Sequence, residues 1–140
     1  MHRNSQSNDY GPEPFVTNIR QAAETNRNFR EALWTGEFLQ LTLMCIPVRG
    51  EIGLEAHPCT DQFLHIERGC GVVMMGPRRG MLNSRSQIRD GCAVFVPAGT
   101  WHNIVNTGGC PLRLYSIYAP PQHPRGVLHQ TKAQADEEEG

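Results

Sequence analysis

Side chains that can bind a metal ion recur at strand spacing in the middle of the chain. Glu55 and His57 are two residues apart, so on a strand both would leave the same face. Residues 58–61 are suited to a turn, which would bring Gln62 onto a neighbouring strand beside that pair. His102 opens a further predicted strand. Two imidazoles, a carboxylate and an amide oxygen predict one divalent ion, with Mn, Fe(II), Ni, Co and Zn all suited to such a set.

Each of these assignments has a structural alternative. Gln62 could satisfy a buried backbone group instead of a metal ion. Glu55 could be a solvated strand carboxylate, and either histidine taken alone could be a surface or turn residue. Ligation is favoured for the two histidines when they are taken together with the spacing of the residues around them, while both interpretations of Gln62 stay open.

Other candidate ligands fit this arrangement less well. His65 and Asp61 are out of phase with the predicted metal face, so we expect an outward histidine and a turn residue. Cys59 could offer a thiolate, although it follows a proline in the predicted turn. His123 and His129 lie in a proline-containing segment that we expect to wrap the barrel, from which they could approach its mouth.

The sequence around these residues predicts an all-β fold. Apolar and polar residues alternate in short runs, and Gly or Pro separates one run from the next. Strands of this kind are typical of a sandwich or a barrel. The predicted strands are residues 39–44, 52–57, 62–67, 71–75, 86–89, 92–96, 102–106 and 112–118.

The 140 residues have room for one domain with a core of its own. Residues 1–14 are polar and predict a flexible lead, residues 15–130 the single domain, and residues 131–140 a solvated acidic tail. Between residues 16 and 34, apolar side chains at roughly helical spacing predict one or two short helices.

Charge and composition argue against several classes of partner. A formal net charge of -1 with scattered arginines predicts no nucleic-acid partner and no membrane surface. We expect no signal peptide, because the N-terminus lacks an apolar core. The five cysteines form no C-x-x-C pair and are expected to be reduced, which predicts a cytoplasmic protein.

Two stretches of the sequence resemble the motifs of the cupin superfamily. All five fixed positions of the second motif are matched in spacing and residue type, at Gly91, Pro97, Gly99, His102 and Asn106. The first motif is matched in spacing from its first ligand onward, at Glu55, His57, Gln62 and Gly69. The resemblance covers about residues 38–118 and implies a double-stranded β-helix, or jelly-roll, barrel, here with a short helical N-terminal arm.

The resemblance carries ligand roles to His57 and His102 directly. Glu55 stands where the family has its first histidine, Gln62 stands where it has a glutamate, and Gly50 is one residue too close to the first ligand. The exchange moves the carboxylate within the site and leaves one imidazole fewer. It keeps the formal charge of the site, so a metal ion is still expected.

The chain looks similar to small single-domain bacterial cupins that are called mannose-6-phosphate isomerase-like. A bound ion would polarise a carbonyl or hydroxyl of a small oxygen-rich molecule, such as a sugar or a hydroxy or keto acid, with Glu55 as candidate base. Two alternatives remain open. One is a non-haem metal dioxygenase, and the other is a non-catalytic sensing or storage barrel.

Spare strand edges and an N-terminal arm also predict a two-fold symmetric homodimer. The segment before Gly50 is expected to contribute to its contact.

Overall fold

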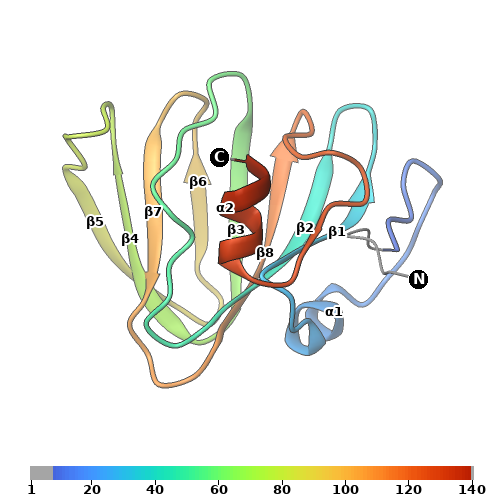
Figure 1. The fold of residues 1–140 in the computed structure, drawn as a ribbon, viewed down its shortest axis with the longest axis horizontal. Helices are drawn as coiled ribbons and strands as arrows, with labels where there is room; N and C mark the ends of the chain where they lie inside the picture. Colours follow the sequence, from blue (N-terminus) through green and yellow to red (C-terminus); the bar gives the residue numbers. More distant parts are fainter. Residues whose placement is uncertain (1–7, 140) are drawn as a thin grey trace.

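A computed structural model describes residues 8–139, and its strands form two antiparallel sheets around a shared core (Figure 1). One sheet has six strands in the order β6-β3-β8-β2-β1-β9, and the other has three in the order β5-β4-β7. The strands are β1 (Arg30–Thr35), β2 (Gln40–Ile46), β3 (Asp61–Arg68), β4 (Cys70–Gly76), β5 (Ser84–Arg89), β6 (Ala93–Val96), β7 (Trp101–Asn106), β8 (Leu112–Ala119) and β9 (Leu128–His129). The all-β barrel predicted from the sequence is confirmed.

The inner face of the six-stranded sheet changes from apolar to polar along its strands. Register places one apolar row side by side on β3, β8 and β2, at Ile66, Leu114 and Met44. Four residues along the same strands, the corresponding row is polar, at Gln62, Tyr118 and Gln40. The apolar end supplies the core, and the polar end is where a site can be built.

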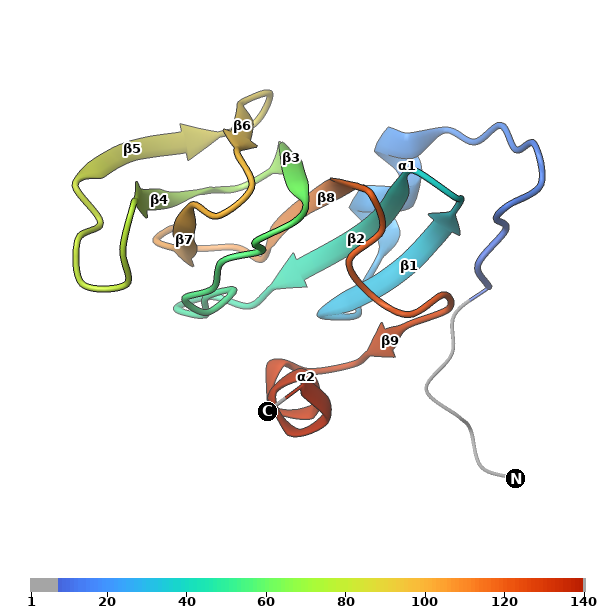
Figure 2. The same cartoon turned by 90° about the horizontal axis from the view of Figure 1, so that it is seen from above.

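Helix α1 (Ile19–Thr25) packs on the outer face of this sheet, against β2, β3 and β8. Its first turn is capped by Asn18, whose side chain accepts from the Gln21 backbone N–H at 3.0 Å. Figure 2 shows α1 and the second helix on opposite sides of the sheet. The first of the short helices predicted between residues 16 and 34 is confirmed by α1. Helix is wrong for Arg30–Thr35, because pairing of β1 with β2 and β9 overrides the local pattern.

The second helix, α2 (Lys132–Glu139), replaces the solvated tail predicted for residues 131–140. Thr131 accepts from the Gln134 backbone N–H through its side chain, and Ala135 is buried against the core. Lys132 and Asp136 form an ion pair of 2.8 Å one turn apart. One small apolar side chain thus docks an otherwise acidic helix. No helix among the described residues is long and apolar enough to cross a membrane.

Residues 52–57 do not form the predicted strand. This segment runs beside β7 and meets it only at isolated bridges, Glu51 with Val105 and Glu55 with His102. Between the bridges, the Asn103 side chain accepts from the Gly53 backbone N–H at 2.8 Å. Because Gly53 has a φ of 110°, the chain bends there and regular pairing stops.

The predicted flexible lead, residues 1–14, is only partly described, and residues 1–7 lie outside the described part. From Asp9 onward the lead is attached to the barrel. The Asp9 carboxylate accepts from the backbone N–H groups of Gly11, Thr35 and Gly126 and from the Thr35 hydroxyl. Burial opposes ionisation, but these hydrogen bonds and the charge of Arg125 outweigh it and lower the pKa of Asp9.

The homodimer stays a prediction. Residues 40–46 do not offer a free edge, because β2 is paired with β1 on one side and β8 on the other. Helix α1 also covers part of its own sheet. Light scattering of the full chain at tens of micromolar would measure the assembly directly, and a monomeric mass would contradict the prediction.

We predict that Asp9→Asn lowers the free energy of unfolding by about 1–2 kcal/mol at pH 7, because the amide cannot accept at both of its positions. The lowered pKa means that the stabilising effect of Asp9 is complete above the unfolded value of about 3.9 and is lost as the pH falls through the folded value. The gap between wild type and variant, measured by urea unfolding, should therefore close in acid.

Asp90→Asn is the matched control, because Asp90 accepts one backbone hydrogen bond from Gly69 through a single oxygen that an amide retains. A gap for Asp9→Asn that is no larger than this control, or that widens in acid, would contradict the prediction.

Candidate metal centre

A reciprocal pair of backbone hydrogen bonds holds Glu55 against His102. The N–H of Glu55 donates to the carbonyl of His102 at 3.0 Å, and the N–H of His102 donates back at 2.9 Å. Two residues further, the carbonyl of His57 accepts from the N–H of Gly99 at 2.8 Å. The segment that carries Glu55 and His57 is thus fixed to β7 and to the turn before it.

The three side chains converge on one point. Nε2 of His57 lies 3.4 Å from Oε2 of Glu55, and Nε2 of His102 lies 3.5 Å from the same oxygen. One potential ligand atom from each residue falls within 4.8 Å of the others. Both imidazoles are buried, and the carboxylate is partly exposed. This cluster could hold a metal ion.

The hydrogen bonding of the two imidazoles resembles that of histidines that bind a metal ion. Nδ1 of His102 lies 2.9 Å from the carbonyl of Thr100, and as a donor there it would leave Nε2 with a free lone pair. Among the described residues, neither His57 Nε2 nor His102 Nε2 has a partner with hydrogen-bond geometry. Buried polar atoms normally have partners, so the pair is unusual without a cation between them.

The carboxylate suits the same cation. Burial would raise the pKa of Glu55, but its contacts with His102 and His57 outweigh burial and hold the pKa well below its usual range. Glu55 is therefore an anion that faces two imidazole nitrogens. This favours a ligand role over the candidate role as a base, since a carboxyl with a very low pKa accepts a proton poorly.

Gln62 lies on β3 and is buried. Its Nε2 donates to the Ser116 hydroxyl at 2.8 Å, while its Oε1 has no partner among the described residues. Cross-strand pairing sets Gln62 beside Tyr118, whose ring meets the His57 ring at 5.8 Å. The hydrogen bond from Nε2 supports the structural interpretation of Gln62, and the unpartnered Oε1 supports the ligand interpretation.

Three further candidate ligands, His65, Asp61 and Cys59, are not part of the cluster. The ring of His65 stacks on Tyr115 at 5.2 Å, in step with the partly exposed positions of β3. Asp61 accepts from the Ala98 backbone N–H and so braces the turn before β7. Cys59 is exposed.

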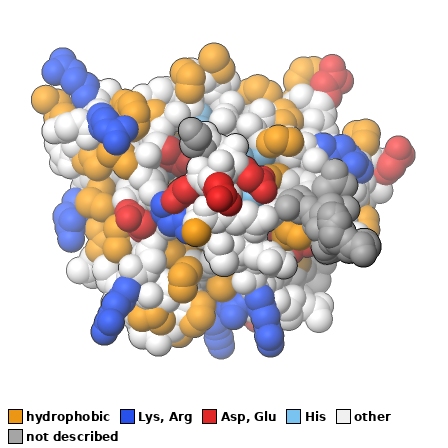
Figure 3. Space-filling model, in the orientation of Figure 1, with side chains coloured by type: hydrophobic (Ala, Val, Ile, Leu, Met, Phe, Trp, Pro, Cys, Tyr) orange, Lys and Arg blue, Asp and Glu red, His pale blue; other side chains and the backbone are white. Residues whose placement is uncertain are grey.

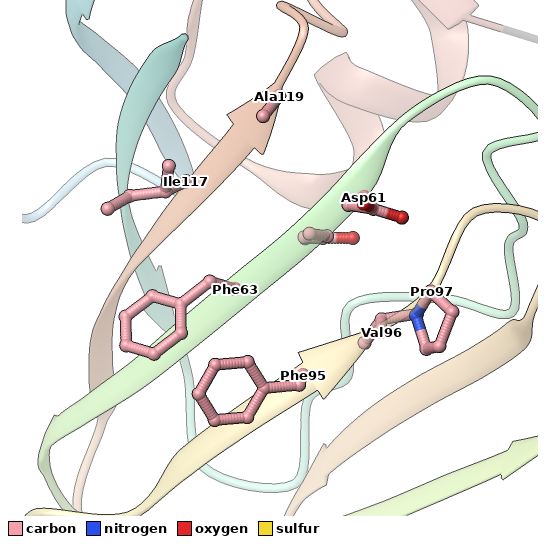
Figure 4. Close-up of a pocket in the computed structure, with 8 residues that line it drawn as sticks. Asp61, Phe63, Phe95, Val96, Pro97, Ile117 and Ala119 are labelled. Atoms are coloured by element: carbon pink, nitrogen blue, oxygen red, sulfur yellow. The ribbon is translucent and has the colours of Figure 1, made fainter.

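An apolar hollow of about 300 Å³ lies on the outer face of the six-stranded sheet. Figure 4 shows Phe63 and Phe95 side by side there, with Ile117 on the neighbouring strand. The rings of Phe63 and Phe95 are 5.0 Å apart, and Phe95 is 69% exposed. The lining is mostly apolar, so this hollow does not share the chemistry of the inner face.

A second cavity, of about 340 Å³, opens beside the histidine cluster. Glu55 lines it together with Arg30 from β1 and Glu139 from α2. Arg30 was not singled out from the sequence, although it precedes Ala32 by two residues and shares its buried face. His123 and His129, expected only to approach the mouth, have buried side chains on this side.

Residues 42–118 match the family description of a cupin domain, and this stretch is more than half of the chain. The chain belongs to the cupin family. It is 56% identical over 133 residues to the uncharacterized protein YrkC of Bacillus subtilis, covering 95% of this chain and 72% of that protein.

Solved structures agree with this assignment. The crystal structure of BH2720 from Bacillus halodurans matches with a TM-score of 0.91 at 56% identity, covering 92% of this chain and 98% of that one. A predicted oxalate decarboxylase from Thermotoga maritima matches with a TM-score of 0.52, covering 72% and 74% of the two chains. At 22% identity, this second likeness shows the fold alone.

We predict that His57→Ala or His102→Ala removes most of the bound divalent metal while the barrel stays folded, because the core rests on the apolar rows. The check is elemental analysis with circular dichroism on the same samples. His65→Ala is the matched control, since it removes a histidine from a strand without touching the cluster. Full metal occupancy in His102→Ala at micromolar protein would contradict the assignment.

We predict further that Glu55→Gln weakens metal binding more than Gln62→Ala does. A carboxylate balances the charge of the ion, whereas an amide offers only a dipole. Loss of Gln62 should cost about 10–100-fold in affinity, as for a supporting partner, and loss of the Glu55 charge should cost more. Competition with a fluorescent chelator measures both. Equal losses, or a larger loss at Gln62, would reverse the ranking.

Proposed function

We propose that this cupin holds one divalent metal ion through His57, His102 and Glu55, and that it binds or transforms a small oxygen-rich molecule there. The observation that carries the proposal is the convergence of two buried imidazole nitrogens on one carboxylate oxygen. Two nitrogens and one oxygen suit Mn, Fe(II), Co, Ni or Zn. When bound, such an ion polarises a carbonyl or hydroxyl oxygen of its ligand.

The protein's own residues orient and enclose this centre. Thr100 fixes the tautomer of His102, and the Tyr118 ring packs against His57 at 5.8 Å. Ser116 fixes the direction of the Gln62 amide. Side chains of helix α2 line the adjoining cavity. A hydroxy acid, a keto acid or a sugar would present its oxygens to the centre from this cavity.

The class of reaction depends on whether a residue beside the ligand can act as a base. An isomerase-like reaction, which mannose-6-phosphate isomerase-like cupins suggest, needs a base beside the ligand. Glu55 is the candidate, but its carboxylate already faces both imidazoles. A dioxygenase is the second candidate function, and it has a specific observation in its favour. Two histidines and one carboxylate are the ligand set of non-haem Fe(II) oxygenases.

We also propose a cytoplasmic location. It is supported by the five cysteines, which are all free in the structure. A non-catalytic sensing or storage role is the outcome expected if a small molecule co-purifies unchanged.

Metal analysis of protein purified without a metal-binding tag tests the proposal, together with mass spectrometry of whatever it carries. We expect about one transition-metal ion per chain. Loading with Fe(II) under anaerobic conditions, followed by measurement of oxygen uptake with candidate hydroxy and keto acids, separates the dioxygenase from the other functions. Protein that arrives without metal and binds none of the five ions at micromolar concentration would refute the proposal.

A further inference from the structure

A buried arginine lies next to the proposed metal centre. The Arg30 side chain is 2% exposed. Its Nη1 donates to Nδ1 of His129 at 3.3 Å and reaches Oε2 of Glu139 at 3.4 Å. Its Nε has no hydrogen-bond partner among the described residues. Burying a guanidinium with an unused donor is costly, so this side chain needs an explanation beyond packing.

Two histidines complete the surroundings of Arg30. Nδ1 of His123 lies 3.3 Å from the same Oε2 of Glu139, so one carboxylate oxygen is held by a guanidinium and an imidazole. His129 accepts from Arg30 on one side and contacts Glu138 through Nε2 at 3.0 Å on the other. Arg30 and His123 therefore form a cradle for a carboxylate, and His129 positions Arg30.

The carboxylate in this cradle comes from the end of α2. Figure 1 shows α2 in front of the six-stranded sheet, and Figure 3 shows acidic side chains gathered over it on the same face. The Glu139 side chain is 44% exposed, while those of Arg30 and His123 are 2% and 6% exposed. Contact with His123 and the charge of Arg30 lower the pKa of Glu139, so this occupant is ionised.

The burial of the two sides of this pair is unequal. The cationic side is built into the barrel wall, and the anionic side sits on an exposed side chain, where ion pairs contribute little to stability. The anion can therefore be exchanged without disturbing the core. An arginine fork also matches a carboxylate in shape, which makes this anion the natural ligand of the cradle.

Arg30 of the cradle and Glu55 of the metal centre line the same cavity. Arg30, Glu55 and Glu139 all line the space of about 340 Å³. A small molecule in this space can meet Arg30 with one end and the neighbourhood of Glu55 with the other. Glu139, the occupant of the cradle, thus lines the space that a ligand approaching Glu55 would enter.

We propose that Arg30 and His123 form a carboxylate-binding subsite, that Glu139 occupies it as an internal surrogate, and that a small carboxylic acid displaces Glu139. This inference rests on the proposed metal centre for its second anchor, and it narrows the ligand class to hydroxy or keto acids rather than neutral sugars. Helix α2 is then a lid whose own carboxylate competes with the ligand.

Lactate is a suitable probe, and propane-1,2-diol is its neutral counterpart on the same carbon skeleton. Binding to the full chain is measured by calorimetry, with Mn added and after removal of metal by EDTA. Glu139→Gln should tighten lactate binding about tenfold, because the internal competitor loses its charge. Arg30→Gln should abolish lactate binding. Glu137→Gln, on an exposed position of the same helix, is the control and should bind as wild type does.

Amide exchange within residues 132–139 should rise when lactate is saturating. The proposal is overturned if Glu139→Gln binds lactate no tighter than wild type, or if the diol gains as much as lactate does. Tighter binding of inorganic phosphate than of lactate would overturn the carboxylate assignment. Glu139→Gln decides the matter even if Arg30→Gln fails to fold. The EDTA-treated samples keep the two proposals apart, since an Arg30 subsite persists there when no metal is bound.

Discussion

The candidate site depends on the reciprocal backbone hydrogen bonds between Glu55 and His102. They form one of two isolated bridges between β7 and the segment after β2, and they bring two residues 47 positions apart into register. They set the Glu55 carboxylate, on a loop, directly opposite the His102 imidazole, on a strand. Because both contacts are between backbone groups, the geometry holds whichever side chains occupy the two positions. That freedom explains how a glutamate can take a place where the cupin motif has a histidine.

The barrel keeps its apolar and polar interior residues in two separate regions along its strands, and this arrangement offsets the free-energy cost of burying polar groups. At one end, rows of aliphatic side chains cross β2, β8 and β3 and supply the free energy of burial. At the other end, the rows carry hydroxyl, amide and phenol groups that hydrogen-bond to one another. Gln40, for example, accepts from two backbone N–H groups and donates to the His123 carbonyl. The polar end can therefore be shaped for a ligand without weakening the core.

Much of this arrangement follows from the sequence. Alternation and Gly or Pro breaks located most strands, because a half-buried strand must alternate whatever it pairs with. The spacing around His102 indicated the histidine cluster. The segment around Glu55 was expected to be a strand and is a bent loop, yet its two side chains still meet, since the backbone bridge at Glu55 does the work that strand pairing would have done.

The remainder could not be found by local reasoning. Arg30 lies in a stretch whose apolar spacing looks helical, and only its pairing with β2 and β9 turns it inward. Its partners His129 and Glu139 are 99 and 109 residues away. Helix α2 has only Ala135 as a buried anchor, so its composition resembles that of a free acidic tail. Contacts of such long range leave no periodic signal in the sequence.

The attachment of the N-terminal lead sets how α2 can move. Asp9 and Arg125 fasten the loop before β9, and β9 itself pairs with β1, so the chain is anchored up to His129. The Gln130 carbonyl also accepts from the Phe29 backbone N–H at 3.2 Å, so Thr131 alone separates the last anchored residue from the helix. An eight-residue helix is about 12 Å long, so a rotation of about 30° at that joint would swing Glu139 through about 6 Å. The helix acts as a short lever with a fixed pivot, and a small change in angle at the pivot is enough to empty the cradle.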